Sequence, residues 1–391
     1  MANDCDSRPP TVVTHKPRVG ILTKHRIPNF GSVLQAYATV AALRELGHAP
    51  GLVDYRYPVL GVHRVPTMRQ RVGTVGNSMI KALVPDQPFA RSASRFDRWY
   101  SDMYTIVGRS YTHPDDLAKD PPPVGRYLVG SDQVWNPRFL RQDESFLLAF
   151  ASNEVPRTSY ASSFGVTALP ESRVKRYAEL LARFETISVR EETGQHIVRR
   201  LLGTNAELVL DPTMLFDAAQ WRQLASDSGL PREGYVLLYG YSPGRSALEE
   251  AGVALANRTK LPVVRVQGRP LDALRWGRLR YAWDFGPREW LDAFSRASLV
   301  IAQSFHGTVF AILMGRPFVS LLRGDEDHDS RQLNLLRLLS IEDRAVYPDD
   351  LVANPQRATF DQDVTAYQHA LQVLRRHSWD VLRRAAGLAG R

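Results

Sequence analysis

Cysteine, long apolar runs and signal sequences are what this chain has least of. Its 391 residues include a single cysteine, Cys5, so an internal disulfide and a cysteine-based metal site are both excluded. No apolar run approaches the roughly twenty residues that span a bilayer, and the N-terminus lacks the basic-then-apolar layout of a signal peptide. We therefore predict a cytoplasmic protein with no stable membrane insertion.

Local signatures of several enzyme classes are also missing. The sequence has no nucleophile elbow, no HExxH zinc motif, no Walker loop and no GxGxxG turn. The acidic run over 325–329 does not have the spacing of a known ligand set, so we expect a solvated loop there and no metal site.

Positive charge is in excess in this chain. The formal net charge is +9, and nearly all of the 50 basic residues are arginines scattered along the chain. No basic stretch is interleaved with aromatic residues as in a nucleic-acid-binding module, so nucleic acid is not an expected partner. The excess instead favours an anionic small molecule, and we expect a phosphorylated substrate.

The length suits two domains rather than one ordinary core. Apolar runs alternate with helix-period segments, which is typical of parallel α/β sheets. We expect two such domains to face each other across a cleft that holds the site. The predicted divisions are a disordered leader over 1–17, an N-terminal α/β domain over 18–220 with an irregular or helical excursion over 58–123, a C-terminal α/β domain over 230–350, and C-terminal helices over 351–391 that pack back across both domains.

The first elements form a strand–helix–strand unit. Strands are predicted over 18–23 and 51–55, with a helix over 32–46 between them, and such a crossover requires parallel strands. In the loop before the helix, Gly31 would let the backbone approach a phosphate or a sugar. A plain strand-to-helix connection is the alternative for this loop.

Polar residues follow several predicted strands of the N-terminal half. Asp132 comes after a strand over 127–129, and Arg190 comes after a strand over 186–189. Ligands of open α/β sheets collect at the carboxyl ends of strands, so Asp132 is a candidate reactive carboxylate and Arg190 a candidate anion clamp. The alternatives are a turn-forming role for Asp132 and an ion pair with a neighbouring glutamate for Arg190.

The stretch over 299–319 reads as a buried strand, a tight turn and an apolar helix that ends at Gly315. His306 and Thr308 lie in the turn. Free backbone N–H groups and the helix dipole favour a phosphate or carboxylate at such a turn. From this stretch alone, the alternative is a structural His306 that only caps the helix or bonds a neighbouring carbonyl.

Several motifs together resemble the polysaccharide pyruvyl transferase family. The resemblance extends from about residue 18 to about residue 339, and its motifs are Asn29-Phe30-Gly31, the run from Gly130 to Pro137, Ser188-Val189-Arg190-Glu191, Asp211-Pro212-Thr213 and Ser304-Phe305-His306-Gly307. It implies two Rossmann-like domains of the GT-B kind. It also implies transfer of a pyruvyl group from phosphoenolpyruvate to sugar hydroxyls, with ketal formation, phosphate release and no cofactor beyond phosphoenolpyruvate as co-substrate.

The resemblance assigns roles to individual residues. His306 would be the general acid, Arg190 would hold the donor's carboxylate or phosphate, and Asp132 would take or position the proton of the acceptor hydroxyl. The N–H groups of the turn, with Ser304 and Thr308, would hold phosphate. The other expected substrate-binding residues are Asn29, Gly31, Gln35, Ser131, Gln133, Trp135, Asn136, Gly307 and Arg331.

One departure from the family pattern concerns the donor. Several characterised members carry an arginine where this chain has Ser304, and Arg316, Arg323 and Arg331 are candidates to replace that charge. The alternatives are a GT-B glycosyltransferase or related transferase that uses another activated donor, and a non-catalytic module that binds anionic glycans. The helix over 308–314 lacks the acid with which nucleotide-sugar enzymes often bind ribose. A polysaccharide, a small sugar and a natural product are the alternatives for the acceptor, and the oligomeric state stays open, a homo-oligomer included.

Overall fold

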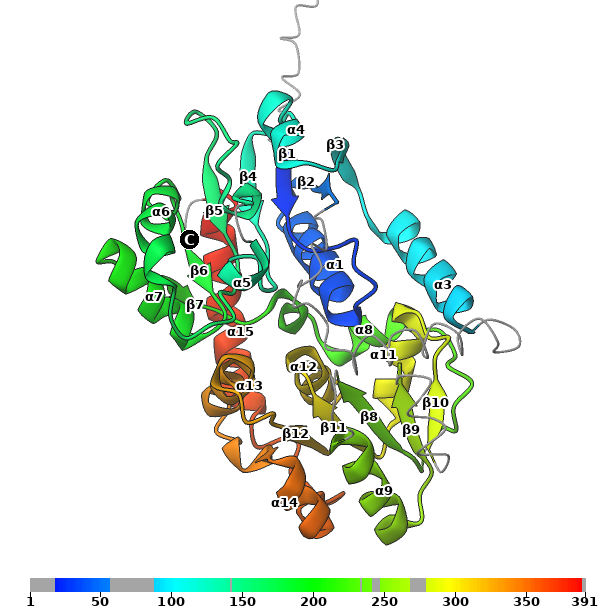
Figure 1. Ribbon diagram of the computed structural model, residues 1–391. Helices are drawn as coiled ribbons and strands as arrows, with labels where there is room; N and C mark the ends of the chain where they lie inside the picture. The colour runs from blue at the N-terminus through cyan, green and yellow to red at the C-terminus, as the bar shows by residue number, and fades with distance from the viewer. Residues whose placement is uncertain are drawn as a thin grey trace, which may run out of the picture.

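The computed structural model describes residues 18–56, 88–140, 143–232, 234–240, 247–267 and 279–388. The predicted leader over 1–17 and the first part of the excursion over 58–123 lie outside the described residues. Figure 1 shows two lobes, each built around one parallel sheet, and we call them the N-terminal and the C-terminal domain.

The N-terminal domain contains a five-stranded parallel sheet in the order β3-β2-β1-β4-β5. Its strands are β1 (Arg18–Leu22), β2 (Ala49–Tyr55), β3 (Ile106–Tyr111), β4 (Arg126–Val129) and β5 (Arg157–Ser159). The predicted strand–helix–strand unit is confirmed, with α1 (Phe30–Glu45) between β1 and β2. Asn29 caps α1 by accepting from Ser32 N, and Gly47 (φ 80°) supplies the left-handed conformation just beyond its end.

The described part of the excursion is more regular than predicted. It contains α3 (Pro88–Met103), β3 and α4 (Pro114–Lys119), and β3 extends the sheet beyond β2. The expectation of an irregular or helical segment was therefore wrong for 106–111. β3 is an edge strand with mostly exposed residues and a glycine at φ 77°, so it has no apolar run that would reveal it in the sequence.

A second, small sheet continues this domain. β6 (Ser188–Val189) and β7 (Glu207–Leu208) pair in parallel. Isolated bridges join Thr158 of β5 to Thr186, just before β6, and Ser162, just after β5, to Val189 of β6. The remaining elements up to the end of this domain are α5 (Pro137–Leu140), η1 (Ser145–Leu147), α6 (Glu171–Leu181), α7 (Glu192–Leu202), η2 (Pro212–Leu215) and α8 (Ala218–Gln223). The carboxyl ends of β4, β6 and β7 thereby come to one edge.

The C-terminal domain contains a six-stranded parallel sheet in the order β10-β9-β8-β11-β12-β13. Its strands are β8 (Val236–Gly240), β9 (Val263–Val266), β10 (Arg280–Ala282), β11 (Leu299–Gln303), β12 (Phe318–Leu321) and β13 (Ala345–Val346), and its helices are α9 (Ala247–Thr259), α11 (Pro287–Arg296), α12 (Phe305–Leu313), α13 (Glu326–Leu338), η3 (Glu342–Arg344), α14 (Pro348–Ala353) and η4 (Pro355–Arg357). The two parallel sheets confirm the predicted α/β class. The short edge strands β10 and β13 were not predicted.

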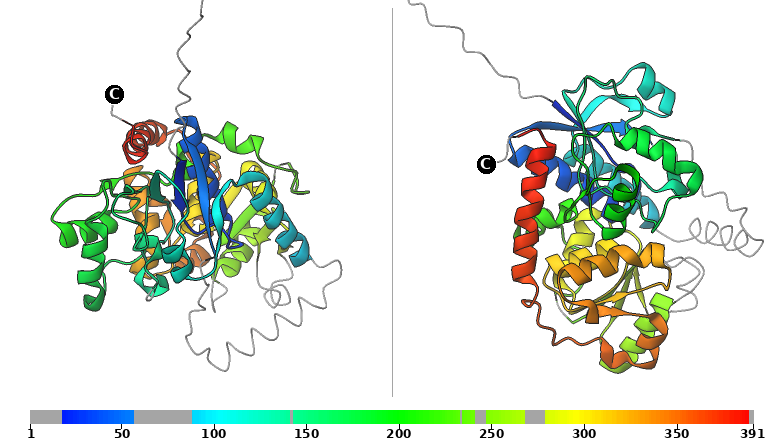
Figure 2. Two further views of the ribbon diagram at one scale, coloured as in Figure 1. Left: turned by 90° about the horizontal axis from the view of Figure 1, so that it is seen from above. Right: turned by 90° about the vertical axis from the view of Figure 1, so that its left-hand side faces the viewer.

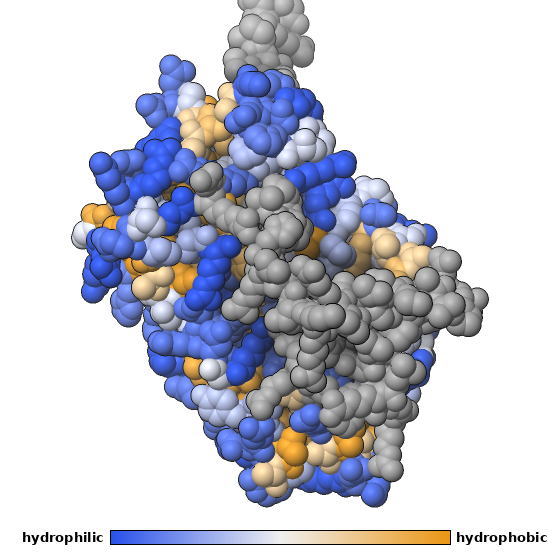
Figure 3. Space-filling model, viewed as in Figure 1, coloured by the Kyte–Doolittle hydropathy of each residue, from blue (hydrophilic) through white to orange (hydrophobic). Residues whose placement is uncertain are grey.

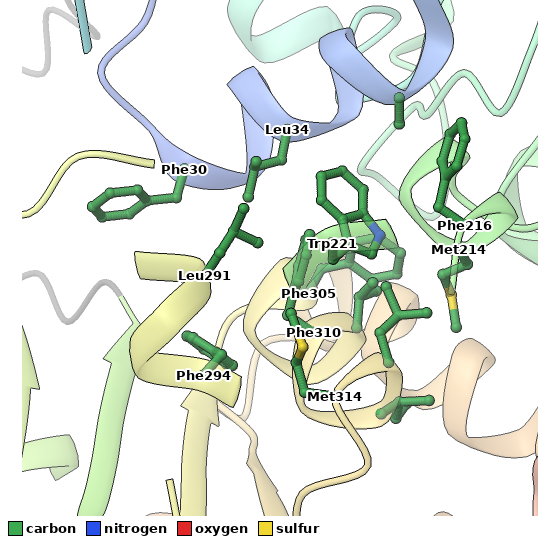
Figure 4. Close-up of a cluster of buried hydrophobic side chains, with 14 of the residues drawn as sticks. Phe30, Leu34, Met214, Phe216, Trp221, Leu291, Phe294, Phe305, Phe310 and Met314 are labelled. Carbon is green, nitrogen blue, oxygen red and sulfur yellow. The ribbon is translucent and has the colours of Figure 1, made fainter. Parts of the chain in front are cut away.

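Aromatic residues fill the junction between the domains. Phe30 of α1 stacks on Trp290 of α11, with ring centroids 5.4 Å apart and an interplanar angle of 14°. Figure 4 shows Leu34 on α1 pointing toward Leu291 of α11. Burial of such large apolar groups is the main favourable term in association, so this contact fixes α1 against the C-terminal domain.

The last helix, α15 (Gln368–Ala385), runs back along both domains (Figure 2). Just before it, the Tyr367 hydroxyl donates to Ile312 O of the C-terminal domain at 3.2 Å. Farther along, Leu210 N of the N-terminal domain donates to Ser378 Oγ at 2.9 Å, and Arg384 pairs with Glu207 at 2.7 Å. The helix therefore ties the two domains together.

The outer face is polar. In the view of Figure 3, hydrophilic residues predominate over the part of the chain that is coloured, and hydrophobic ones are scattered among them. Within the described ranges, no helix is both long and apolar enough to cross a membrane.

Candidate active site at the domain junction

Charged side chains from both domains meet where strands of the N-terminal domain end. Asp132 follows β4, Arg190 follows β6 and Asp211 follows β7, whereas His306 lies in the first turn of α12 in the C-terminal domain. The structure thus brings together the three residues on which the predicted chemistry depends, Asp132, Arg190 and His306, and adds Asp211 to them.

Arg190 is the most buried cation of this group, with 3% of its surface exposed. Its Nη1 donates to Asp211 Oδ2 at 2.8 Å and to Ser131 Oγ at 3.1 Å, and its guanidinium lies 4.4 Å from the centre of the Phe305 ring. The neighbouring Glu191 is 3.8 Å away, so the alternative of a simple ion pair with an adjacent glutamate does not describe the main contact. Arg190 Nε and Nη2 have no hydrogen-bond partner among the described residues.

Asp211 was not among the predicted site residues, although its motif supports the family resemblance. Its Oδ1 accepts from the Thr213 hydroxyl at 2.6 Å, and its Oδ2 lies 3.5 Å from His306 Nε2. Burial by itself would raise the pKa of Asp211. The His306 and Arg190 charges and the donated hydrogen bonds nevertheless hold this pKa far below its usual range, so the carboxylate stays ionised.

His306 projects from α12 against the first turn of α1. The helix is capped by Ser304, whose Oγ accepts from Gly307 N at 3.1 Å, so His306 does not have the capping role considered from the sequence. A Cβ atom on Gly31 would lie 2.1 Å from His306 Nδ1. Gly31 therefore permits a close approach, but to the imidazole ring rather than directly to a ligand. His306 Nε2 is buried and has no hydrogen-bond partner in the described part of the chain.

Asp132 adopts a left-handed backbone conformation, with φ 76°. Its Oδ2 accepts from Ser32 Oγ at 2.6 Å, and its Oδ1 accepts from Gln133 N at 2.7 Å. Burial alone would raise the pKa of Asp132, but the charges of Lys24, Arg190 and His306 and the Ser32 hydrogen bond lower it to about 2. A carboxylate this acidic is a weak base, so it is better suited to orienting a hydroxyl than to removing its proton.

Two more cations border Asp132. Arg331 of α13 was predicted, and the Gln133 side-chain oxygen, turned toward it, accepts from Nη1 at 2.8 Å and from Nη2 at 3.2 Å. Burial and the Arg190 charge lower the pKa of Arg331 to about 10. Lys24 was not predicted. Its Nζ donates to Gln133 O at 2.9 Å, and burial lowers its pKa although Asp132 opposes that shift.

Three predicted substrate-binding residues belong to the scaffold instead. Trp135 is fully buried, and its indole donates to Phe146 O at 2.9 Å. Asn136 accepts from Arg138 N at 2.9 Å, which fixes the start of α5. Gln35 is fully buried and donates to Thr23 Oγ1 at 2.9 Å. The contacts of these three side chains are thus with the protein itself, although Gln35 Oε1 is buried without a hydrogen-bond partner among the described residues.

The predicted phosphate-holding turn is also used internally in part. Gly307 N and Thr308 N bond to Ser304, and the Thr308 hydroxyl lies 2.9 Å from Ser320 Oγ of β12. The expectation that Ser304 and Thr308 hold phosphate is therefore not supported by their contacts. Asn29 likewise caps α1 and is exposed at the surface.

Residues of α13 hold the strand ends in place across the junction. Asn334 Nδ2 donates to Arg190 O at 3.2 Å, and Glu192 N donates to Asn334 Oδ1 at 3.2 Å. Asp327 accepts from Thr167 N at 2.8 Å and pairs with Arg138. The position of Arg190 thus depends on both domains.

The acidic run over 325–329 is more ordered than the predicted solvated loop. Asp325 caps α13, and the buried Asp329 accepts from Arg323 N and Gly324 N at 2.9 Å and 2.8 Å. In the described ranges, no three His, Cys, Asp or Glu side chains are grouped so that they could hold a metal ion.

Lys24 and Asp211, which were not predicted as site residues, share a position that is visible in the sequence. Lys24 follows β1 and Asp211 follows β7, so both occupy the same kind of strand-end position as Asp132 and Arg190. Extending the strand-end rule to every parallel strand would have found them.

Comparison with known proteins gives one family match. The family model described as polysaccharide pyruvyl transferase matches residues 29–325. No curated protein matches the sequence.

Solved structures offer distant likenesses. Arabidopsis thaliana UGT89C1, complexed with UDP-L-rhamnose, is 10% identical, with a TM-score of 0.48 and coverage of 95% of this chain and 99% of that chain. Anabaena Alr3699/HepE, in complex with UDP-glucose, is 12% identical, with a TM-score of 0.49 and coverage of 95% and 98%. Methanocaldococcus jannaschii UDP-GlcNAc 2-epimerase is 8% identical, with a TM-score of 0.47 and coverage of 91% and 98%.

Proposed function

The chain belongs to the polysaccharide pyruvyl transferase family, a family of transferases, and we propose that it moves a pyruvyl group from phosphoenolpyruvate to hydroxyls of a sugar or sugar-like acceptor. The product is a cyclic ketal, and inorganic phosphate is released. No cofactor beyond phosphoenolpyruvate is part of this proposal.

The observation that carries the donor assignment is a set of buried nitrogen atoms that make no hydrogen bond with a described residue, three of which lie 3.5–3.8 Å from a carboxylate. Arg190 Nε and Nη2, Arg331 Nε and His306 Nε2 are all buried and have no hydrogen-bond partner in the described residues. A buried polar group left unpaired costs about 1–3 kcal/mol, and more when it is charged. An anionic ligand removes that cost, and guanidinium groups match the planar carboxylate and the phosphate that phosphoenolpyruvate carries.

The first chemical step adds one acceptor hydroxyl across the double bond of phosphoenolpyruvate. The hydroxyl oxygen bonds to the central carbon, His306 delivers a proton to the methylene carbon, and the hydroxyl proton restores the acid. Asp132, ionised because its pKa is about 2, accepts a hydrogen bond from the hydroxyl and orients it.

The second step closes the ketal. A second hydroxyl bonds to the same carbon, the bond to the phosphate oxygen breaks, and the hydroxyl proton leaves with phosphate. Arg190 and Arg331 stabilise the charge on the departing phosphate, since fixed cations in a water-poor site act strongly on developing charge. Asp211 keeps Arg190 in place through the 2.8 Å contact.

The test is phosphate release from phosphoenolpyruvate with a panel of glycosyl acceptors, in the wild type and in His306→Gln. We expect the substitution to lower the rate about 100-fold or more, the usual contribution of general acid catalysis. His369→Gln, which changes an exposed histidine on α15, is the matched control and should keep the rate.

Two outcomes contradict the proposal. The first is that no acceptor gives phosphate while a nucleotide sugar raises the melting temperature, which would favour a glycosyltransferase. The second is an acceptor that binds equally well and is unchanged in the wild type and in His306→Gln, which would favour a non-catalytic glycan-binding module.

A further inference from the structure

A separate cavity opens beside the candidate active site. It has a volume of about 390 Å³ and is lined by Lys24, Arg26, Tyr55, Arg56, Asp97 and Tyr100, among others. These residues come from the loop after β1, the end of β2 and the helix α3. The cavity thus lies beyond the carboxyl ends of parallel strands, where open α/β sheets bind ligands, and its size is in the range of small-molecule sites.

Part of the cavity wall is already neutralised and rigid. Arg26 forms two hydrogen bonds with Asp54, from Nε at 2.7 Å and from Nη2 at 2.9 Å. Asp54 is buried at 4% exposure and also lies 3.4 Å from His25 Nε2. Since bidentate pairs of this kind hold their geometry, Arg26 serves to shape the wall rather than to offer a free charge.

Three other groups of the wall bear on a ligand, and one of them is the exposed carboxylate of Asp97, which disfavours a negative charge close to it. The exposed Arg56 guanidinium has no hydrogen bond or ion pair with any described residue, and the buried hydroxyl of Tyr100 has no hydrogen-bond partner in the same part of the chain. Arg56 attracts a negative charge, and Tyr100 pairs with a hydroxyl.

Lys24 connects this cavity to the active site. It lines the cavity, and its Nζ donates to the carbonyl of Gln133, the residue that follows Asp132. Its charge acts on Asp132. A ligand in the cavity that reaches Lys24 is therefore next to the carboxylate that orients the attacking hydroxyl.

We propose that this cavity is the acceptor subsite and that it takes a sugar bearing a negatively charged group, with the charge at Arg56 and the reacting hydroxyl at Lys24. The role of this sugar as the acceptor rests on the proposed function, whereas binding of the charged sugar in the cavity does not. The negative group can be a carboxylate, as in a uronic acid, or a phosphate ester, because both offer the oxygens that a guanidinium pairs with.

The experiment measures binding by calorimetry without any donor. The probes are glucose, galactose and mannose, each as the neutral methyl glycoside, the uronic acid methyl glycoside and the 1-phosphate, so charge changes while the ring is kept. We expect the charged forms of at least one sugar to bind about tenfold or more tightly than the neutral form, as for a hydrogen bond to a charged group.

Two substitutions locate the binding. Arg56→Gln should abolish the preference for charged probes, and Tyr100→Phe should weaken charged and neutral probes alike by severalfold. Arg98→Gln is the matched control, because Arg98 is an exposed arginine of α3 that does not line the cavity. Retention of the charge preference in Arg98→Gln excludes a general effect of net charge. Preference for the uronic acid or for the 1-phosphate identifies the source of the charge.

The subsite assignment is overturned if no probe binds, if neutral and charged forms bind equally, or if the charge preference survives Arg56→Gln. Its failure is distinguishable from that of the donor assignment. Charged sugars that bind through Arg56 while phosphoenolpyruvate yields no phosphate would remove the donor and leave the subsite. Phosphate release that requires His306 but is indifferent to Arg56 would remove the subsite and leave the donor.

Discussion

The N-termini of α1 and α12 have the same local design and opposite roles. Each helix follows a parallel strand and is capped by the side chain of the residue just before it. Asn29 accepts from Ser32 N, and Ser304 accepts from Gly307 N. In the first turn of α1, Gly31 has no side chain. The imidazole of His306, in the first turn of α12, occupies the space that a side chain on Gly31 would fill.

This pairing shows why similar turns need different residues. The α12 turn contributes the side chain to which the proposal gives the acid role, and the α1 turn contributes room for it and a hydroxyl, Ser32, for Asp132. Neither turn uses its capped N–H groups for a ligand. In the proposal, anions are bound instead by guanidinium groups, those of Arg190 after β6 and of Arg331 on α13.

The largest expected loss of stability follows from removing Asp211, the carboxylate beside the His306 ring. Asp211→Ala removes the carboxylate nearest to the buried Arg190, at 2.8 Å, and leaves it, among the described residues, only the two at 3.8 Å. Breaking a buried ion pair typically costs about 3–5 kcal/mol. Urea unfolding followed by circular dichroism measures the loss. The exposed Asp217 caps α8, so Asp217→Ala should cost only about 1 kcal/mol. Equal losses in the two variants would contradict the central place given to Asp211.

Filling the space at Gly31 tests the contact directly. Gly31→Ala puts a methyl group where Nδ1 of His306 lies, and such overpacking costs about 1–3 kcal/mol. Because the ring must move, phosphate release should fall by a factor on the order of 100, the contribution of a positioned acid.

A double variant provides the control for Gly31. In His306→Ala the obstructing ring is gone, so adding Gly31→Ala should cost little further stability. Additive losses in the double variant would show that the Gly31 methyl group clashes with something other than His306.

The pH dependence of stability tests Asp132, which accepts a hydrogen bond from Ser32 beside Gly31. The pKa of Asp132 is about 2 in the folded protein and lies below its ordinary value, so its contribution to stability is present above about pH 4 and is lost as the pH falls toward 2. The contribution amounts to about 2 kcal/mol, at 1.36 kcal/mol per pKa unit. Unfolding of the wild type and of Asp132→Asn, compared from pH 7 to pH 2, should show a stability difference that shrinks in that window. A difference that is constant with pH would contradict the lowered pKa.

The smallest expected effect separates capping from ligand binding. Ser304→Ala and Asn29→Ala should each cost about 1 kcal/mol, as for the loss of an N-cap. Because the Ser304 hydroxyl serves the cap, the KM for phosphoenolpyruvate should change little in Ser304→Ala. A KM that rises tenfold or more would restore the phosphate-binding role expected from the sequence.

Much of the fold was predictable because the signals are local. The apolar run of β8 and the capped helices α1 and α12 indicate their own structure, since a strand buried on both faces is apolar throughout and a cap lies next to its helix. The edge strands β3, β10 and β13 give no such signal. They are short or exposed, and each exists only because a neighbouring strand offers hydrogen bonds to it.

The sequence by itself determined which chemistry is present and roughly where. Asp132 and Arg190 follow parallel strands of the N-terminal domain, whose carboxyl ends lie at one edge, so their approach follows from topology. His306 follows β11 of the other sheet, and it reaches them because the two domains pack together. Only the tertiary structure decided which polar atoms remain unpaired. Thr308 and Trp135 have their polar groups bonded inside the fold, whereas Arg190 Nε and Nη2 make no hydrogen bond with a described residue and lie 3.8 Å from the nearest carboxylates. Hydrogen-bond partners are set by neighbours in space that are distant in the chain, and spacing along the sequence does not specify them.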